Sequence, residues 1–173
     1  QTVTPRNLLR EKMIEYLDIN INRDENIVII ADSLNLDIKN KLTSIFPNSI
    51  KIKPEFEGYV LPELLDSLLV DSLPNKVIVE SEIFTLVSSI VSQLNSQITP
   101  ERDVRLYTTY KGNQYDDPSI DIKNLGDLRF TYPSISKKIR SDSITDFKEN
   151  YKDLFGSLPN SDVVRGYDIT KDI

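Results

Sequence analysis

The sequence predicts an α/β sandwich of three layers, in which helices cover both faces of a mostly parallel sheet of about five strands. In Asn26–Asp32, four branched apolar residues follow one another without polar alternation, which is typical of a strand buried on both faces. Apolar residues recur at helical spacing on both sides of this run, over Pro5–Leu17 and Leu36–Phe46. Strand and helix patterns then continue to alternate, and right-handed crossovers between parallel strands produce three layers.

The first half of the chain shows clear helix starts and stops. Thr4 is a candidate N-cap for the first helix, and Pro5 fits the first helical position, where a missing N–H costs nothing. Pro47 ends the second helix. Ser49–Lys53 alternates polar and apolar residues, so it predicts a half-covered strand near a sheet edge.

The second half repeats the alternation up to Pro133. A third helix is expected over Leu61–Leu73 and is ended by Pro74. A strand follows over Lys76–Glu80, and its apolar centre is similar to that of the first strand. The next helix is expected over Glu82–Leu94, with Ser81 as its N-cap. The remaining predicted elements are a strand, a short helix and a fifth strand, at Val104–Thr109, Ile120–Leu125 and Leu128–Tyr132.

The tail differs from what precedes it. After Pro133 there are two helical patterns, Ser143–Phe155 and Ser161–Ile173, with no strand between them. The sequence therefore predicts an α/β lobe over residues 1–132 and a helical tail over residues 133–173.

Composition excludes several classes of function. The net charge is −6, and the one basic cluster, Lys137–Arg140, is short and is followed by Asp142, which argues against a nucleic-acid groove. The chain has no Cys and no His, so it lacks thiol nucleophiles, Ser–His dyads and the commonest transition-metal ligand. These absences weigh against an enzyme, which is the third hypothesis, and we expect no cofactor. No apolar run approaches the ~20 residues of a membrane-spanning helix, and no signal peptide is recognisable at Gln1.

A motif in the tail carries a family resemblance. It reads Phe147-x-x-x-Tyr151-x-x-x-Phe155-Gly156-x-x-Pro159, followed by Gly166-Tyr167-Asp168. This pattern resembles the type I periplasmic binding proteins, in particular the branched-chain amino-acid receptors. The preceding elements fall into register with the second lobe of that family, and Leu128–Pro133 resembles the strand that returns the chain to the first lobe. Val163 and Val164 depart from the pattern, because the family usually has small residues there.

The resemblance implies a function as well as a fold. It implies a non-catalytic receptor component that binds a small molecule such as an amino acid, in the periplasm or cell envelope, as part of ABC-type transport. The first lobe is missing, so we expect the chain to be a fragment of a two-lobed protein. A homodimer is another way to bury the apolar face of the tail. An alternative function is an interaction or scaffolding module that has this fold and no longer binds a ligand.

Ligands of open α/β sheets bind beyond the carboxyl ends of the strands. Glu82 matches the helix start from which an acid of the family's second lobe meets an amino-acid ammonium group. The predicted ligand-binding residues are Glu82, Ser81, Thr108, Tyr110 and Tyr132. Glu82 has a simpler explanation, because an acid in a first helical turn is stabilised by the helix dipole by ~0.3–1 kcal/mol. Tyrosines at strand ends are also common as rim packing.

Acidic pairs suggest two further hypotheses. Response-regulator receivers share an acid after the first strand, here Asp32, but they also need an Asp after the third strand and a later Lys. This chain has Glu80 after the third strand and no Lys at the end of Leu128–Tyr132. Acid–base catalysis would need a carboxylate pair, for which the candidates are Asp116-Asp117 and Glu80 with Glu82. A polar loop and a helix start explain these pairs more simply.

Overall fold

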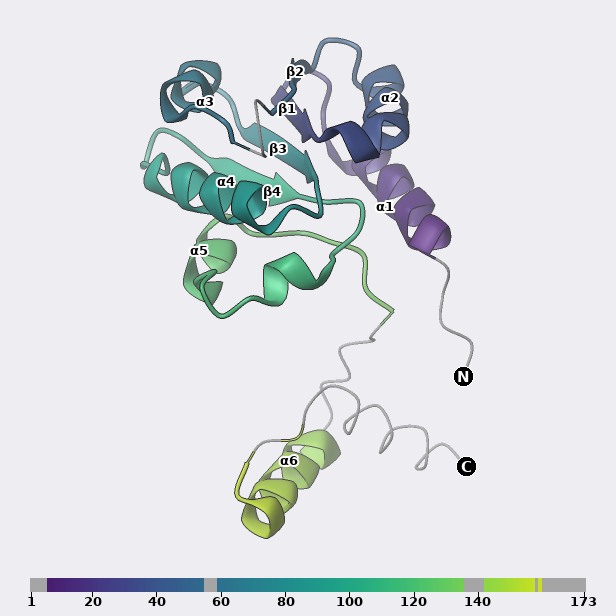
Figure 1. The fold of residues 1–173 in the computed structure, drawn as a ribbon, viewed down its shortest axis with the longest axis vertical. Coiled ribbons are helices and arrows are strands. Elements are labelled where there is room, and N and C mark those ends of the chain that lie inside the picture. Colours follow the sequence, from purple (N-terminus) through teal and green to yellow (C-terminus); the bar gives the residue numbers. More distant parts are fainter. Residues whose placement is uncertain (1–5, 55–58, 136–141, 158, 160–173) are drawn as a thin grey trace. The chain divides into compact units, whose positions relative to one another are not determined.

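A four-stranded parallel sheet, in the order β2-β1-β3-β4, forms the centre of the fold (Figure 1). The computed structural model describes residues 6–54, 59–135, 142–157 and 159, and only the backbone of 142–146. The chain divides into two compact units, Gln1–Ile135 and Ser136–Ile173. The strands, all in the first unit, are β1 (Asn26–Ala31), β2 (Ile50–Ile52), β3 (Asn75–Glu80) and β4 (Val104–Tyr107). The α/β class and the parallel sheet predicted from the sequence are confirmed.

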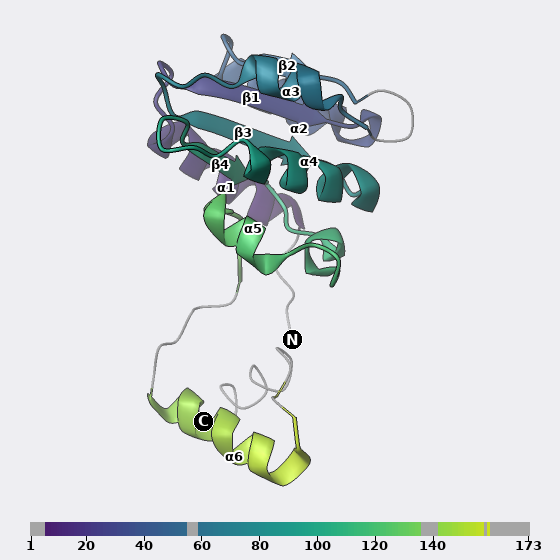
Figure 2. The ribbon, with the colours of Figure 1, turned by 90° about the vertical axis from the view of Figure 1, so that its left-hand side faces the viewer.

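Helices cover both faces of the sheet in the first unit. Two lie on one face, α1 (Arg6–Asn20) and α2 (Leu36–Ile45). The other face carries α3 (Pro62–Leu68), α4 (Phe84–Ser96) and α5 (Ile122–Asp127). From the side, α3 and α4 lie in front of the strands and α1 lies behind them (Figure 2). Two short 3₁₀ helices complete the unit, η1 (Ser33–Asn35) and η2 (Asn113–Asp116).

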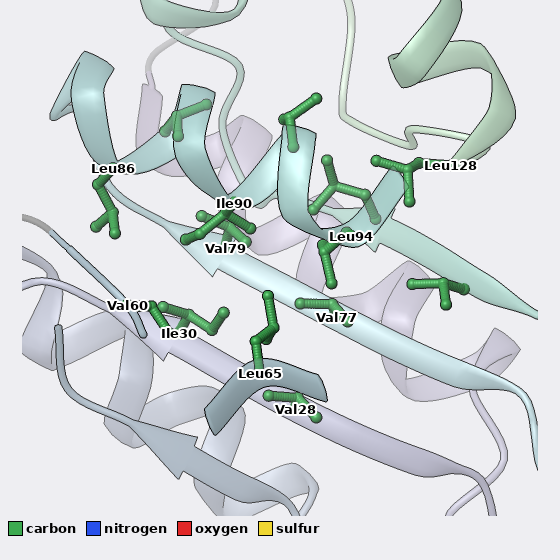
Figure 3. Packing of buried hydrophobic residues seen from close by; sticks show 14 of the residues in the cluster. Val28, Ile30, Val60, Leu65, Val77, Val79, Leu86, Ile90, Leu94 and Leu128 are labelled. Carbon is green, nitrogen blue, oxygen red and sulfur yellow. The ribbon is translucent and has the colours of Figure 1, made fainter. Parts of the chain in front are cut away.

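The apolar residues of β1 contribute to the hydrophobic cores on both faces of the sheet. Val28 and Ile30 belong to the core under α3 and α4, whereas Ile27 and Ile29 belong to the core under α1 and α2, because successive strand residues point to opposite faces. Figure 3 shows the larger core, where α4 packs its apolar side chains on β1 and β3. The residues labelled there from α4 are Leu86, Ile90 and Leu94, and all three are fully buried.

Asn75, at the start of β3, is a fully buried amide at the amino end of the sheet. Its Oδ1 accepts hydrogen bonds from the Val70 N–H at 2.9 Å and from Asn26 Nδ2 at 2.8 Å. Its Nδ2 donates to the Val70 carbonyl at 2.8 Å and to the Asp103 carbonyl at 3.0 Å. One side chain thus joins β1, β3 and the segments that precede β3 and β4.

The fifth strand is present only as one parallel bridge between Thr131 and Tyr107. The Thr131 N–H donates to the Leu106 carbonyl at 2.9 Å, and the Leu106 N–H donates to the Leu128 carbonyl at 3.0 Å. Arg129 lies between them with φ 47°, a left-handed conformation that interrupts an extended strand. Just beyond β4, the Thr108 N–H donates to the Thr131 carbonyl at 3.2 Å. The predicted strand over Leu128–Tyr132 therefore makes three backbone hydrogen bonds with Leu106–Thr108 and does not form a full ladder.

Two predicted helix limits are wrong. The third helix ends at Leu68 instead of near Leu73, because Leu69 is extended and the next N–H, that of Val70, donates to Asn75. The fourth helix begins at Phe84, not at Glu82. Its N-cap is Ile83, which makes no side-chain capping hydrogen bond, so the prediction that Ser81 caps this helix is also wrong. Two further limits also differ: the first helix extends to Asn20 instead of Leu17, and the short helix predicted over Ile120–Leu125 lies at Ile122–Asp127.

The second unit contains α6 (Asp142–Phe155), as predicted for Ser143–Phe155. The ring centroids of Phe147 and Tyr151 are 5.9 Å apart, and those of Tyr151 and Phe155 are 4.5 Å apart. Gly156 follows with φ 72°, which is typical of the glycine that ends a helix. The predicted helix Ser161–Ile173, the Gly166-Tyr167-Asp168 motif and the Thr4 cap lie outside the described residues. Nowhere in 6–54, 59–135 or 142–157 is a helix long and apolar enough to cross a bilayer.

Candidate functional site

The carboxyl ends of β1 and β3 lie next to each other, and the chain leaves them toward opposite sides of the sheet. From β1 it passes through α2 to β2, and from β3 through α4 to β4. This is the topological switch point at which open α/β sheets bind ligands. The polar residues buried there come from the ends of β1, β3 and β4, and they are Asp32, Glu80, Ser81, Thr108 and Thr109.

Glu80 is the most deeply buried acid at this edge, with 1% of its surface exposed. Its carboxylate accepts hydrogen bonds from the Thr109 N–H at 2.5 Å and from the Thr109 hydroxyl at 2.8 Å. The Arg10 guanidinium lies 3.8 Å away. Burial raises the pKa of the Glu80 carboxyl above its ordinary value, and the Thr109 hydrogen bonds and the Arg10 charge oppose this rise.

Asp32 is the second buried acid, and hydrogen bonds occupy both of its oxygens. Its Oδ1 accepts from the N–H groups of Leu34 and Asn35, at 2.9 Å and 3.2 Å, and from Asn35 Nδ2 at 2.9 Å. Its Oδ2 accepts from the Ser81 hydroxyl at 2.6 Å. Asp32 thus caps η1 and joins the end of β1 to the segment that follows β3.

Arg10 connects α1 to both buried acids. One of its terminal nitrogens donates to Asn35 Oδ1 at 2.8 Å, and Asn35 in turn contacts Asp32. Only 11% of the Arg10 side chain is exposed, and this burial lowers the pKa of its guanidinium, against the attraction of Glu80. Two buried carboxylates therefore share one buried cation.

Above this buried layer is an open hollow of about 480 Å³, lined by Arg6, Glu82, Phe84, Tyr110, Gly112, Asn113, Gln114 and Asp117. The Arg6 guanidinium forms an ion pair with Glu82. It also lies over the Tyr110 ring, 4.5 Å from the centroid. The hollow thus places a cation, an anion and an aromatic face side by side, with 40% of the Arg6 side chain and 52% of the Glu82 side chain exposed.

The five residues predicted to bind a ligand fall into three groups. Glu82 and Tyr110 meet in the hollow through Arg6. Ser81 and Thr108 lie buried beneath it, where Ser81 contacts Asp32 and the Thr108 hydroxyl donates to the Tyr110 carbonyl at 3.2 Å. Tyr132 is outside the lining of the hollow; its ring lies 5.1 Å from the Phe130 ring and 5.1 Å from Lys111 Nζ.

Arg6 and Arg10 were missed from the sequence, although a signal exists. The buried residues of α1 are Met13 and Leu17, and Arg10 and Arg6 continue this stripe at helical spacing toward the N-terminus. Because α1 precedes a strand that it packs against, the start of its inward face lies at the carboxyl end of the sheet. An arginine that continues a buried stripe there is a candidate counter-ion for an acid at a strand end.

The other acidic pairs do not form a second site. Asp117 accepts hydrogen bonds from the Ser119 N–H and hydroxyl, at 2.9 Å and 2.5 Å, and Asp116 forms an ion pair with Lys111. In the part of the chain that the structure describes, no three residues among His, Cys, Asp and Glu gather as metal ligands. The receiver-like acid Asp32 is instead occupied by η1 and Ser81.

The hollow therefore lies beyond the carboxyl ends of β3 and β4 and holds two opposite, partly exposed charges, and the layer beneath it is internally hydrogen-bonded. Comparisons of the chain with protein-family models, with curated proteins and with solved structures each gave no match.

Proposed function

We propose that the α/β unit is one lobe of a receptor similar to the type I periplasmic binding proteins, and that it binds a small, amino-acid-like molecule without catalysis. The observation that carries the proposal is the meeting of Arg6, Glu82 and Tyr110 in an open hollow beyond the carboxyl ends of β3 and β4, the edge at which open α/β sheets bind ligands. The aromatic helix motif of the tail supports the same family. A receptor of this class works in the periplasm or cell envelope and delivers its ligand to an ABC transporter.

Each of the three side chains has a role in this proposal. Glu82 pairs with the ammonium group of the ligand, and Arg6 pairs with its carboxylate, for which a guanidinium fork is well suited. Tyr110 supplies a flat surface beside both charges. Without a ligand the two charged residues pair with each other, and an exposed pair of this kind is worth only ~0–1 kcal/mol. A zwitterion can therefore replace the pair at little cost.

The hollow is open on one side, as expected for a binding site that is formed by two lobes and of which this unit supplies one half. Ligand pockets bury most of the ligand surface, and a hollow open on one side needs a covering lobe to do so. In this proposal the first lobe of the same protein supplies that cover.

The test is thermal unfolding of the longer native chain, with both lobes, against a panel of amino acids and small metabolites. A ligand that binds only the folded state adds RT ln(1 + [L]/Kd), about 2.7 kcal/mol at a 100-fold excess over Kd. We expect Glu82→Gln and Arg6→Ala each to reduce the shift. Arg23→Ala is the matched control, because Arg23 forms a similarly exposed ion pair with Asp18 beyond the other end of α1.

If the thermal shift persists in both Glu82→Gln and Arg6→Ala, the protein binds the ligand but not in this hollow. The absence of any shift across the panel would favour the scaffolding module instead. One observation favours that second function: four large apolar side chains on and beside α3, each more than 40% exposed, are Tyr59, Leu61, Leu64 and Leu73. Exposed apolar residues mark a protein contact when they form one contiguous patch, and self-association measured by analytical ultracentrifugation would test for such a contact.

A further inference from the structure

Glu82 lies on backbone that belongs to no regular element. β3 ends at Glu80 and α4 begins at Phe84, so Ser81, Glu82 and Ile83 form an irregular connection between them. The N-cap of α4, Ile83, makes no side-chain capping hydrogen bond. A side chain on such a segment holds a fixed position only if other residues fix its backbone.

Ser81 makes two hydrogen bonds that fix this connection. Its hydroxyl oxygen accepts from the Ile83 N–H at 3.0 Å, across Glu82, and its hydroxyl hydrogen is donated to Asp32 Oδ2 at 2.6 Å. On the opposite side, Gln114 Nε2 donates to the Ser81 carbonyl at 2.7 Å. The segment is therefore held both from the end of β1 and from η2.

Asp32 is rigid enough to act as the fixed point. It directly follows β1, where Ala31 is in register with Glu80, and its own N–H donates to the Glu80 carbonyl at 3.2 Å. Its Oδ1 is occupied by η1, which leaves Oδ2 directed at Ser81. Asn35 extends this chain of hydrogen bonds to Arg10, one helical turn from Arg6.

We propose that Asp32 is a positioning residue for the site: through Ser81 it fixes Glu82, and through Asn35 and Arg10 it fixes the helix that carries Arg6. The chain Arg10–Asn35–Asp32–Ser81 thereby sets the separation of the two charges in the hollow. This role rests on the proposed function, because Glu82 and Arg6 are the ligand-binding charges there. It also gives the acid after the first strand a role that needs neither a metal ion nor phosphorylation.

The test uses NMR of the ¹⁵N,¹³C-labelled chain and needs no ligand. In Ser81→Ala we expect amide hydrogen exchange at Ile83 to accelerate roughly fivefold to tenfold, the change expected for the loss of one hydrogen bond. Asp32→Asn places an amide NH₂ opposite the Ser81 hydroxyl, which loses its acceptor; the NH₂ instead donates to the Ser81 oxygen and competes there with the Ile83 N–H. We therefore expect faster exchange at Ile83 in this variant as well, although Asp32 does not contact Ile83. Ser81→Thr keeps the hydroxyl and should restore protection, and Ser96→Ala is the control at the other end of α4.

The second readout is the ¹³C resonance of the Glu82 carboxylate. In the wild-type background Arg6→Ala should shift this resonance, because the pair is formed; in the Ser81→Ala and Asp32→Asn backgrounds the same substitution should shift it less. Exchange at Ile83 that responds to Ser81→Ala but not to Asp32→Asn would overturn the role of Asp32. An unchanged response of Glu82 to Arg6→Ala would overturn it too. The proposed function is tested separately: it fails if no compound of the ligand panel raises the unfolding temperature.

Discussion

The shared cation Arg10 gives the sharpest prediction about stability. Arg10→Met keeps the aliphatic stem of the side chain and leaves the buried Glu80 and Asp32 without their cation. At the observed 3.8 Å and an effective dielectric constant of about 20, the attraction between Arg10 and Glu80 is about 4 kcal/mol. Removal of one partner of a buried pair costs about 3–5 kcal/mol in measured cases. We therefore expect Arg10→Met to lower the free energy of unfolding by about 3–5 kcal/mol near pH 7.

This cost should depend on pH in a definite direction. Burial already raises the pKa of Glu80 in the folded protein, and Arg10 opposes the rise, so Arg10→Met should raise this pKa further. A raised folded-state pKa means that the folded protein binds the proton more readily than the unfolded chain. The contribution of Glu80 to stability is then fully present below its ordinary pKa and is lost as pH rises through the raised value. The cost of Arg10→Met should consequently shrink as pH falls from about 8 toward about 5.

Urea unfolding across this pH range is the assay, with Glu80→Gln and the double variant as companions. The side chain that Glu80→Gln introduces is neutral, so the double variant should recover most of the stability that Arg10→Met loses. A cost below about 1 kcal/mol at neutral pH would refute the reasoning, since it would mean that water screens the cluster as it screens an exposed pair. A double variant no more stable than Arg10→Met would refute it as well.

The other predictions concern the rest of the first unit. Asn75→Ala should cost at least about 2 kcal/mol, because it removes the partner of the Val70 N–H and of the Val70 carbonyl, and each unsatisfied group costs about 1–3 kcal/mol. The Asp103 carbonyl keeps the hydrogen bond from the Asn75 backbone N–H. Urea unfolding measures the cost, and a loss below about 1 kcal/mol would show that water replaces the amide. Leu94→Ala should cost about 2–5 kcal/mol, because Leu94 is fully buried in the core under α4. A thermal midpoint equal to that of the wild type would contradict the packing described for α4.

The strands and layers were predictable because their signals are local. The run in Asn26–Asp32 contains the whole pattern of a doubly buried strand, and four of the expected strands form. Limits set by distant side chains were not predictable. The third helix stops early because Asn75 takes the Val70 N–H. The fourth begins at Phe84, after a connection in which Ser81 is bound to Asp32. The fifth strand fails at the left-handed Arg129, a conformation that residue type does not reveal.

Of the side chains that meet in the hollow, Glu82 and Tyr110 were named from the sequence and Arg6 was not, whereas the predicted Tyr132 lies outside the lining. The strand ends identify Glu82 and Tyr110, because the carboxyl ends of parallel strands meet at one edge. Arg6 and Arg10 come from a helix that precedes the whole sheet, and only the three-dimensional packing of α1 brings them to that edge. The same packing exposes Glu82 and buries its neighbour Ser81. Because the sequence does not contain this information, both residues were predicted to contact a ligand.

The place of β3 in the sheet has a consequence for how binding would be detected. β3 lies between β1 and β4, and all six of its residues are buried, whereas the edge strand β2 is only three residues long. Local opening starts where few buried contacts exist and reaches the best-packed segment last. Glu82 follows the end of β3 with only Ser81 between them, so a ligand held there would protect the segment that separates only in global unfolding. Its effect would then be a rise of the whole cooperative transition, without a change in the fluctuations of β2.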